Sequence, residues 1–173
     1  MDILAHGLWG GVIFGWRNKF FWAALFGMLP DLLAFGPFFI YRIASGTFSF
    51  GKPELNSIPQ IVFTSYNISH SLFTGLVIFL VVRFLVSKEL SVAAGAYSLH
   101  ILCDIPTHDQ TFFPTPFLFP LSDVKVDGIS WANRYFMLGN YLALIVAYWF
   151  YFAGRRKIKR ESIYPSPEER GEK

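Results

Sequence analysis

Cysteine and charge are both scarce in this chain. Cys103 is the single cysteine among 173 residues, so no intrachain disulfide can form. Charged residues make up 16% of the chain, against about 25% in ordinary soluble domains. The H-E-x-x-H, G-x-S-x-G and P-loop motifs are also missing. The sequence therefore argues against a disulfide-stabilised scaffold and offers none of these catalytic signatures, and we interpret Cys103 as a packed apolar residue rather than a ligand.

Apolar residues dominate instead. Hydrophobic residues make up 53% and aromatic residues 19% of the sequence, which contains 20 phenylalanines. This composition predicts an all-α fold, an integral membrane helical bundle with about five apolar helices. The first helix is shorter than the ~20 residues that cross a bilayer. The expected helices cover approximately residues 3–16, 20–41, 68–86, 89–104 and 131–153.

Two longer connections separate these helices. Residues 42–67 contain glycines and prolines, and residues 105–130 are rich in both proline and phenylalanine. Proline breaks a spanning helix, so the second connection is expected at the lipid–water interface, where aromatic residues gather. Ser69 is a possible N-cap of the third helix.

The basic residues predict an orientation. Residues 155–173 contain seven Lys/Arg and four Asp/Glu, which account for the whole net charge of +3. We therefore expect a membrane-embedded domain over 1–154 and a basic cytoplasmic tail over 155–173, disordered from about residue 161. Arg17, Lys19, Arg83 and Lys88 would face the cytoplasm with it, as expected for a multi-pass protein of the plasma (inner) membrane. A basic tail is not a nucleic-acid-binding face, so no nucleic-acid partner is predicted.

All four histidines lie at the edges or inside of apolar segments. They occur in AHGLWGG (His6), ISHSLF (His70), SLHILCD (His100) and PTHDQ (His108). Ionisable residues are costly in a membrane and persist mostly where they face the bundle interior and bind or transfer something. The predicted topology places the histidines, with Asp31 and Asp104, at a similar depth.

These residue types suit a metal site. His100 and Asp104 are spaced i, i+4 on one helical face, and imidazole and carboxylate both bind zinc. The predicted ligands of one or two divalent ions, zinc or alternatively manganese, are His6, Asp31, His70, His100 and Asp104. The alternative is a set of buried polar residues that bond across helices.

Further roles are expected around this site. Asp104 and Asp31 are the candidate catalytic residues, because a carboxylate can assist proton transfer. His108, Asp109 and Asp2 are possible additional ligands or partners of the ligands. Arg134 could bind a substrate phosphate, or it could be an interfacial anchor. Asp2 could equally be an exposed charge.

The motifs resemble those of the YdjM-like family of predicted membrane-bound metal-dependent hydrolases. The matching pieces are AHGLWGG, GMLPDLL, SHSLF, HILCDIPTH and PFLFPLSD, followed by Gly128 and Trp131. The family is described as similar to zinc-dependent phospholipase C. The resemblance implies a helical metal site formed by His6, Asp31, His70, His100 and Asp104, and phosphoester hydrolysis. Many members carry a second acidic residue and a histidine shortly after the Pro-Asp pair, a stretch where this chain has Leu33 and Phe35.

The sequence thus predicts a membrane-bound metal-dependent hydrolase. Its expected partners are membrane lipid and a phosphoester of a lipid or lipid-linked substrate. The alternative is a non-catalytic metal-binding membrane scaffold or interaction protein. No oligomeric state is predicted.

Overall fold

The computed structural model describes residues 1–16, 18–49, 51 and 53–163, with side chains described as far as residue 156. Within this part of the chain there is no strand, which confirms the all-α prediction. The helices are α1 (Ile3–Phe14), α2 (Phe20–Ala44), α3 (Gln60–Ser69), α4 (Leu72–Val81), α5 (Lys88–Asp104) and α6 (Arg134–Ile163), with a 3-10 turn η1 (Leu55–Ser57) and a π-helical turn η2 (Val82–Val86).

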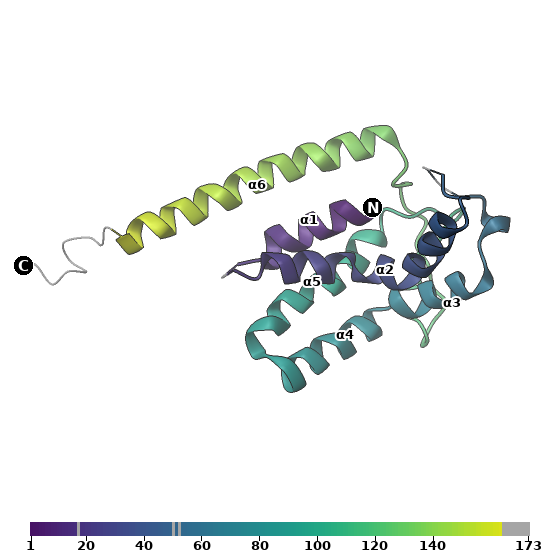
Figure 1. Cartoon of the computed structure of the whole chain (residues 1–173), viewed down its shortest axis with the longest axis horizontal. Coiled ribbons are helices and arrows are strands. Elements are labelled where there is room, and N and C mark those ends of the chain that lie inside the picture. Colours follow the sequence, from purple (N-terminus) through teal and green to yellow (C-terminus); the bar gives the residue numbers. More distant parts are fainter. Residues whose placement is uncertain (17, 50, 52, 164–173) are drawn as a thin grey trace, which may run out of the picture.

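The helices α1, α2 and α5 form the centre of the bundle (Figure 1). The backbones of α1 and α2 come unusually close, because a Cβ atom on Gly27 would lie 2.6 Å from the carbonyl oxygen of His6. Small residues permit such an approach between apolar helices. On α5, Ala93, Ala94 and Ala96 are fully buried. The buried face of helix α5 therefore lies in the core of the bundle.

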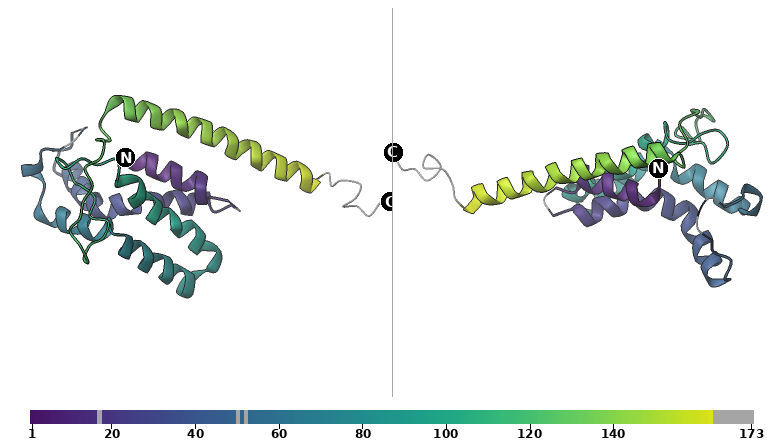
Figure 2. Two further views of the ribbon diagram at one scale, coloured as in Figure 1. Left: turned by 180° about the vertical axis from the view of Figure 1, so that it is seen from behind. Right: turned by 90° about the horizontal axis from the view of Figure 1, so that it is seen from above.

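The long helix α6 runs along α1 on the side of the bundle opposite α4 (Figures 1 and 2). Polar side chains join the two helices at intervals along their length. Trp9 Nε1 donates to Asn140 Oδ1 at 2.9 Å. Three tyrosine hydroxyls of α6 donate to the α1 segment: Tyr141 to Asp2 Oδ1 (3.1 Å), Tyr148 to the Leu8 carbonyl (3.1 Å) and Tyr151 to the Gly15 carbonyl (3.2 Å). These contacts fix α6 to α1.

Two helices are long and apolar enough to cross a membrane, namely α2 and the Arg134–Arg156 part of α6. Counting α3 with the Leu72–Val86 segment as one broken span would give three. The structure therefore supports two or three candidate spans and does not support the predicted five apolar helices. The helix α1 has only 12 residues, and α5 has 17 residues that include the polar His100 and Asp104.

The expected third helix, over 68–86, is broken. The helix α3 begins at Gln60, inside the expected connection, and meets the Leu72–Val86 segment at an angle of 63°. Ser71, and not Ser69, caps the second piece, because its hydroxyl accepts a hydrogen bond from Phe73 N. Ser69 is the last residue of α3.

Partners from elsewhere in the chain satisfy the backbone at this break. The hydroxyl of Tyr97 donates to the Ser69 carbonyl (2.7 Å), and Leu72 N donates to the Phe117 carbonyl (3.0 Å). The Ser71 hydroxyl also donates to the Phe119 carbonyl. The Phe- and Pro-rich connection therefore packs into the bundle at the break.

The two ends of the bundle differ in character. The turn between α1 and α2, the turn between η2 and α5 and the C-terminal part of α6 lie at one end (Figure 1). Arg155 Nη2 bonds Asn18 Oδ1 at 2.7 Å, which joins two of these segments. The helix α3 and the 105–133 connection lie at the other end (Figures 1 and 2). The helix α6 continues to Ile163, past the expected end near residue 153, and the tail from residue 164 lies outside the described residues.

Candidate metal centre

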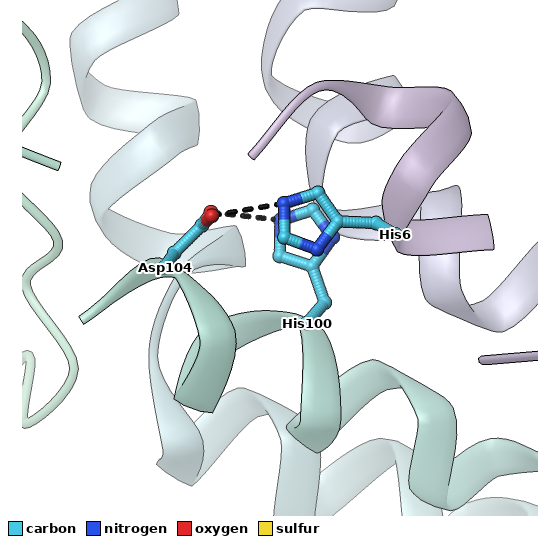
Figure 3. Close-up of side chains that lie close together, drawn as sticks. All are labelled: His6, His100 and Asp104. Carbon is cyan, nitrogen blue, oxygen red and sulfur yellow. Dashed lines mark ion pairs between the residues drawn. The ribbon is translucent and has the colours of Figure 1, made fainter. Parts of the chain in front are cut away.

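The five predicted ligand residues lie together in one buried cluster, which we call the His/Asp cluster (His6, Asp31, His70, His100 and Asp104). His6 comes from the start of α1, Asp31 from the middle of α2 and His70 from the break between α3 and α4. His100 and Asp104 come from the last turns of α5 (Figure 3). Residues more than 90 positions apart in sequence thus converge.

Asp104 is at the centre of the cluster. Its Oδ1 atom lies 2.8 Å from His6 Nε2 and 2.6 Å from the α-amine of Met1. Its Oδ2 atom lies 3.1 Å from His100 Nε2 (Figure 3) and 3.7 Å from both His70 Nε2 and His108 Nδ1. The carboxylate therefore faces four nitrogen-bearing rings in a space without exposed surface.

Asp31 closes the cluster from the side of α2. Its Oδ1 atom lies 3.4 Å from His70 Nε2 and 3.9 Å from His100 Nε2. The possible ligand atoms form two groups, His6 with His100 and Asp104, and Asp31 with His70 and His100, each within 4.8 Å of one another. His100 belongs to both groups, so the residues could hold one ion or two neighbouring ions.

The hydrogen bond of His100 decides which of its nitrogens can bind a metal. Its Nδ1 atom lies 2.7 Å from the Gly27 carbonyl oxygen, which can only accept. Nδ1 is therefore protonated, and in a neutral ring Nε2 presents its lone pair to the Asp104 carboxylate. His70 is held similarly, with Nδ1 3.0 Å from the Ser69 hydroxyl. A hydrogen bond at the other ring nitrogen is the usual way in which proteins orient a metal-binding histidine.

Several polar atoms of the cluster have no hydrogen-bond partner among the described residues. They are Nδ1 and Nε2 of His6 and Oδ2 of Asp104. The 2.8 Å between His6 Nε2 and Asp104 Oδ1 is a short distance without the geometry of a hydrogen bond. Burying such atoms without a partner is costly, and a bound ion can supply the missing partner. Without a bound ion, protonated imidazoles would instead balance the negative charge of the carboxylates.

The spacing of the donors fits a small divalent ion. Zinc binds imidazole nitrogen and carboxylate oxygen at about 2.0–2.2 Å, usually in a tetrahedron, whose ligand atoms are then roughly 3.3 Å apart. The distances from Asp104 to His6 and His100 are 2.8 and 3.1 Å, and the Nε2 atoms of His70 and His100 are 3.2 Å apart. These buried histidines and aspartates could therefore hold a metal ion.

A second group of buried residues supports the cluster. Tyr66 stacks on His70, with ring centroids 3.8 Å apart, and its hydroxyl donates to the Phe113 carbonyl at 2.8 Å. His108 Nδ1 lies 3.3 Å from the Tyr66 hydroxyl and 3.2 Å from the Thr115 hydroxyl. Burial lowers the pKa of His108 to about 4, so the ring is neutral at pH 7. The sequence prediction missed Tyr66, although it lies one turn before His70, because α3 was expected to be a loop.

The structure places three other predicted site residues outside the cluster. Asp2 caps α1 by accepting from Ala5 N (3.0 Å) and also accepts from the Tyr141 hydroxyl. Asp109 accepts a hydrogen bond from Thr111 N at 2.9 Å and is in neither ligand group. Arg134 is exposed, and its Nη2 atom donates to the neighbouring Tyr135 hydroxyl at 2.7 Å. Among the hydrogen bonds described for these residues, none reaches a ring of the cluster.

Cys103 also lies apart from the ligands. Its side chain is half-buried and packs against Met1, Ala5 and Leu144. This position agrees with its interpretation as a packed apolar residue.

A cavity of about 190 Å³ opens beside the cluster. Asp31, Tyr66 and His108 line it together with aromatic residues. Asp31 is also the one residue of the His/Asp cluster with a measurable side-chain exposure, 15% against 0% for the other four. The cavity is therefore a route by which a small molecule could reach the cluster.

Neither a family model, nor a curated protein, nor a solved structure matches the chain. The resemblance to the YdjM-like family stays a prediction, and the function has to be argued from the site.

Proposed function

We propose that this chain is an integral membrane metal-dependent hydrolase. Its substrate would be a phosphoester of a lipid or a lipid-linked molecule, and its cofactor one or two divalent ions, zinc or manganese. The observation that supports this most strongly is the buried convergence of three histidines and two aspartates, in which His6 and Asp104 retain polar atoms without hydrogen-bond partners.

The residues of the cluster would have separate roles. A divalent ion supplies Lewis acidity and a nucleophile at neutral pH, and two ions can clamp both oxygens of an in-line displacement. His6, His70, His100 and Asp104 would hold the metal, since their side chains are fully enclosed. The carbonyl of Gly27 fixes the ring of His100 so that Nε2 points inward.

Asp31 differs from these four residues because it faces the cavity. It could bind metal and also accept a proton from the attacking group, or return one to the leaving oxygen. Asp104 is the other candidate for proton transfer, but five nitrogen atoms already surround its two oxygens within 3.7 Å. We therefore assign proton transfer to Asp31 and metal binding to Asp104.

The proposal includes an orientation in the plasma (inner) membrane. The turns that contain Lys19, Arg83 and Lys88 lie at the same end of the bundle as the C-terminal part of α6 (Figure 1). A shared basic end favours the cytoplasmic side. The C-terminal tail would then lie in the cytoplasm, and the cavity would open towards the other face of the membrane.

A non-catalytic, metal-stabilised scaffold is the second candidate. The full burial of four of the five cluster residues favours it, because structural metal sites are closed. A catalytic site instead needs a position open to water and substrate. The exposure of Asp31 to the cavity is the feature that favours catalysis.

Metal content is the first test. Wild type, His100→Ala and Asp123→Asn would be purified in lipid nanodiscs and analysed by mass spectrometry for bound metal. Asp123→Asn is the control, because Asp123 is an exposed carboxylate outside the cluster. We expect one or two zinc or manganese ions per chain in wild type and control, and none in His100→Ala. Folded wild type that binds no metal even after zinc or manganese is added would overturn the proposal.

Hydrolysis is the second test. Metal-loaded protein would be assayed with lipid phosphoesters in vesicles, before and after chelation. Activity that chelation abolishes and zinc or manganese restores supports the hydrolase. A stoichiometric metal with no turnover of any phosphoester would favour the scaffold.

A further inference from the structure

The wall of the cavity beside the His/Asp cluster has a polar part and an apolar part. Asp31, Tyr66 and His108 form the side next to the cluster. Most of the remaining wall is apolar and aromatic, with Phe35, Phe39, Phe112, Phe113 and Trp131. A ligand of this cavity must therefore combine an apolar part with a polar part at Asp31.

The helix α2 arranges these two parts in a line. Asp31, Phe35 and Phe39 are spaced i, i+4 and i+8, so they lie on one face of the helix over about 12 Å of its axis. All three line the cavity, and the rings of Phe35 and Phe39 stack with centroids 6.0 Å apart. Apolar contact therefore begins at the carboxylate and continues along the helix.

The size of the cavity limits its occupant. An apolar cavity of about 150 Å³ holds one benzene molecule. A cavity of about 190 Å³ consequently holds the first part of one hydrocarbon chain, or one ring, and the second chain of a two-chain lipid would have to lie outside it.

We propose that this cavity binds the hydrocarbon of a single-chain amphiphile, with its anionic head on the metal that the cluster would hold beside Asp31 and its chain along Phe35 and Phe39. The preferred substrate class is thus a phosphoester of one alkyl or isoprenoid chain, rather than a two-chain glycerolipid. Phe39 determines chain specificity, because it lies at the far end of this line. The identity of the head group rests on the proposed metal-dependent hydrolysis, whereas the chain site rests on the cavity alone.

The test is photo-crosslinking in nanodiscs made of a two-chain phosphatidylcholine. The probe is a single-chain alkylphosphonate, which resists hydrolysis and carries a diazirine near the end of the chain. Labelled peptides would be mapped by mass spectrometry on metal-loaded protein. We expect labels in the segments with Phe35–Phe39 and Phe112–Phe113, despite the excess of two-chain lipid. Unlabelled alkylphosphonate should compete at least about tenfold better than the alkanol of the same chain, because its charged head would interact with the bound metal by ~1.4 kcal/mol or more.

Two variants of the same helix provide a matched pair. Phe39→Trp enlarges a side chain that lines the cavity and should lower labelling by a long chain several-fold, with a smaller effect on a short chain. Phe21→Trp makes the same change at a position that is 68% exposed and outside the cavity, and should leave labelling unchanged. Labels found only on the exposed face of α6, or labelling that Phe39→Trp leaves unchanged, would overturn the inference.

Metal content measured on the same samples separates this inference from the proposed function. Protein that holds metal and hydrolyses phosphoesters without labelling of the cavity would overturn the chain site alone. Competed labelling of the cavity in folded protein that binds no metal would support the chain site and overturn the proposed hydrolase.

Discussion

The Nδ1 atom of His100 lies 2.7 Å from the carbonyl oxygen of Gly27. The same glycine lies at a close approach of α1 to α2, since a Cβ atom there would lie 2.6 Å from the His6 carbonyl oxygen. Gly27 of α2 thus orients the ring of His100 on α5 and determines how closely the backbone of His6 on α1 approaches α2. His6 and His100 stack as a result, with centroids 3.6 Å apart.

Gly27→Ala should therefore damage the cluster without touching a ligand. The added methyl would meet backbone, which cannot rotate away, so α1 must shift and His6 with it. We expect a loss of about 1–3 kcal/mol in the free energy of unfolding and a loss of about 10–100-fold in metal affinity. Metal titration followed by equilibrium dialysis measures the second effect.

Gly36→Ala is the control for this variant. Gly36 lies on the same helix, and a Cβ atom there would meet nothing within 4 Å. It should bind metal like wild type, and its stability should change little, because the helix preference of alanine over glycine is opposed by Pro37, whose ring disfavours a Cβ-bearing residue before it in a helix. Equal metal affinity in the two variants would contradict the role given to Gly27.

Asp104→Asn tests whether metal and stability are linked. A ligand that binds only the folded protein stabilises it, by about 2.7 kcal/mol at a hundredfold excess over its dissociation constant. Added zinc should thus raise the thermal midpoint of wild type, and chelation should lower it, as followed by intrinsic fluorescence. Asp104→Asn should show neither shift, whereas Asp123→Asn should behave as wild type. A zinc-dependent midpoint that survives in Asp104→Asn would remove this residue from the ligand set.

The residues of the cluster could be predicted because each is anomalous in its own segment. A histidine or aspartate inside an apolar run is costly wherever that run lies in a membrane, so His6, Asp31, His70, His100 and Asp104 could be singled out one by one. The i, i+4 spacing of His100 and Asp104 then followed from helical geometry alone. The structure brings all five together.

The break at His70 could not be predicted in the same way. The apolar run continues through Leu72, and its local pattern favours one helix. What stabilises the break is distant in sequence: the hydroxyl of Tyr97 and the carbonyls of Phe117 and Phe119 satisfy the backbone and side chains there. Tyr66 was missed for a related reason, since residues 42–67 contain too many glycines and prolines to predict a helix at its end.

Tyr66→Phe separates the two contacts of this tyrosine. The ring that stacks on His70 stays, but the Phe113 carbonyl loses its partner, and His108 keeps only the Thr115 hydroxyl. A buried group left without its hydrogen bond costs about 1–3 kcal/mol, whereas metal affinity should change by less than about tenfold, because no ligand moves. Chemical denaturation with and without zinc distinguishes the two effects. Tyr135→Phe, at a tyrosine that is 69% exposed, should change neither quantity, and a loss of metal in Tyr66→Phe above that range would mean that the hydroxyl positions a ligand.

The contacts between α1 and α6 predict that three substitutions on α6 affect the stability of the protein to different extents. Tyr141 donates to the Asp2 carboxylate, Tyr148 donates to the Leu8 carbonyl, and Trp149 is 66% exposed. Hydrogen bonds between membrane helices average about 0.6 kcal/mol, and a charged acceptor strengthens a bond roughly twofold. Denaturation in mixed micelles should therefore show the largest loss of stability for Tyr141→Phe, a smaller loss of about 0.6 kcal/mol for Tyr148→Phe, and no significant change for Trp149→Phe. None of the three should alter metal content, because the ligands lie on α1, α2, α5 and the α3–α4 break. Equal losses for all three variants would mean that apolar packing, and not this series of polar contacts, holds α6 against α1.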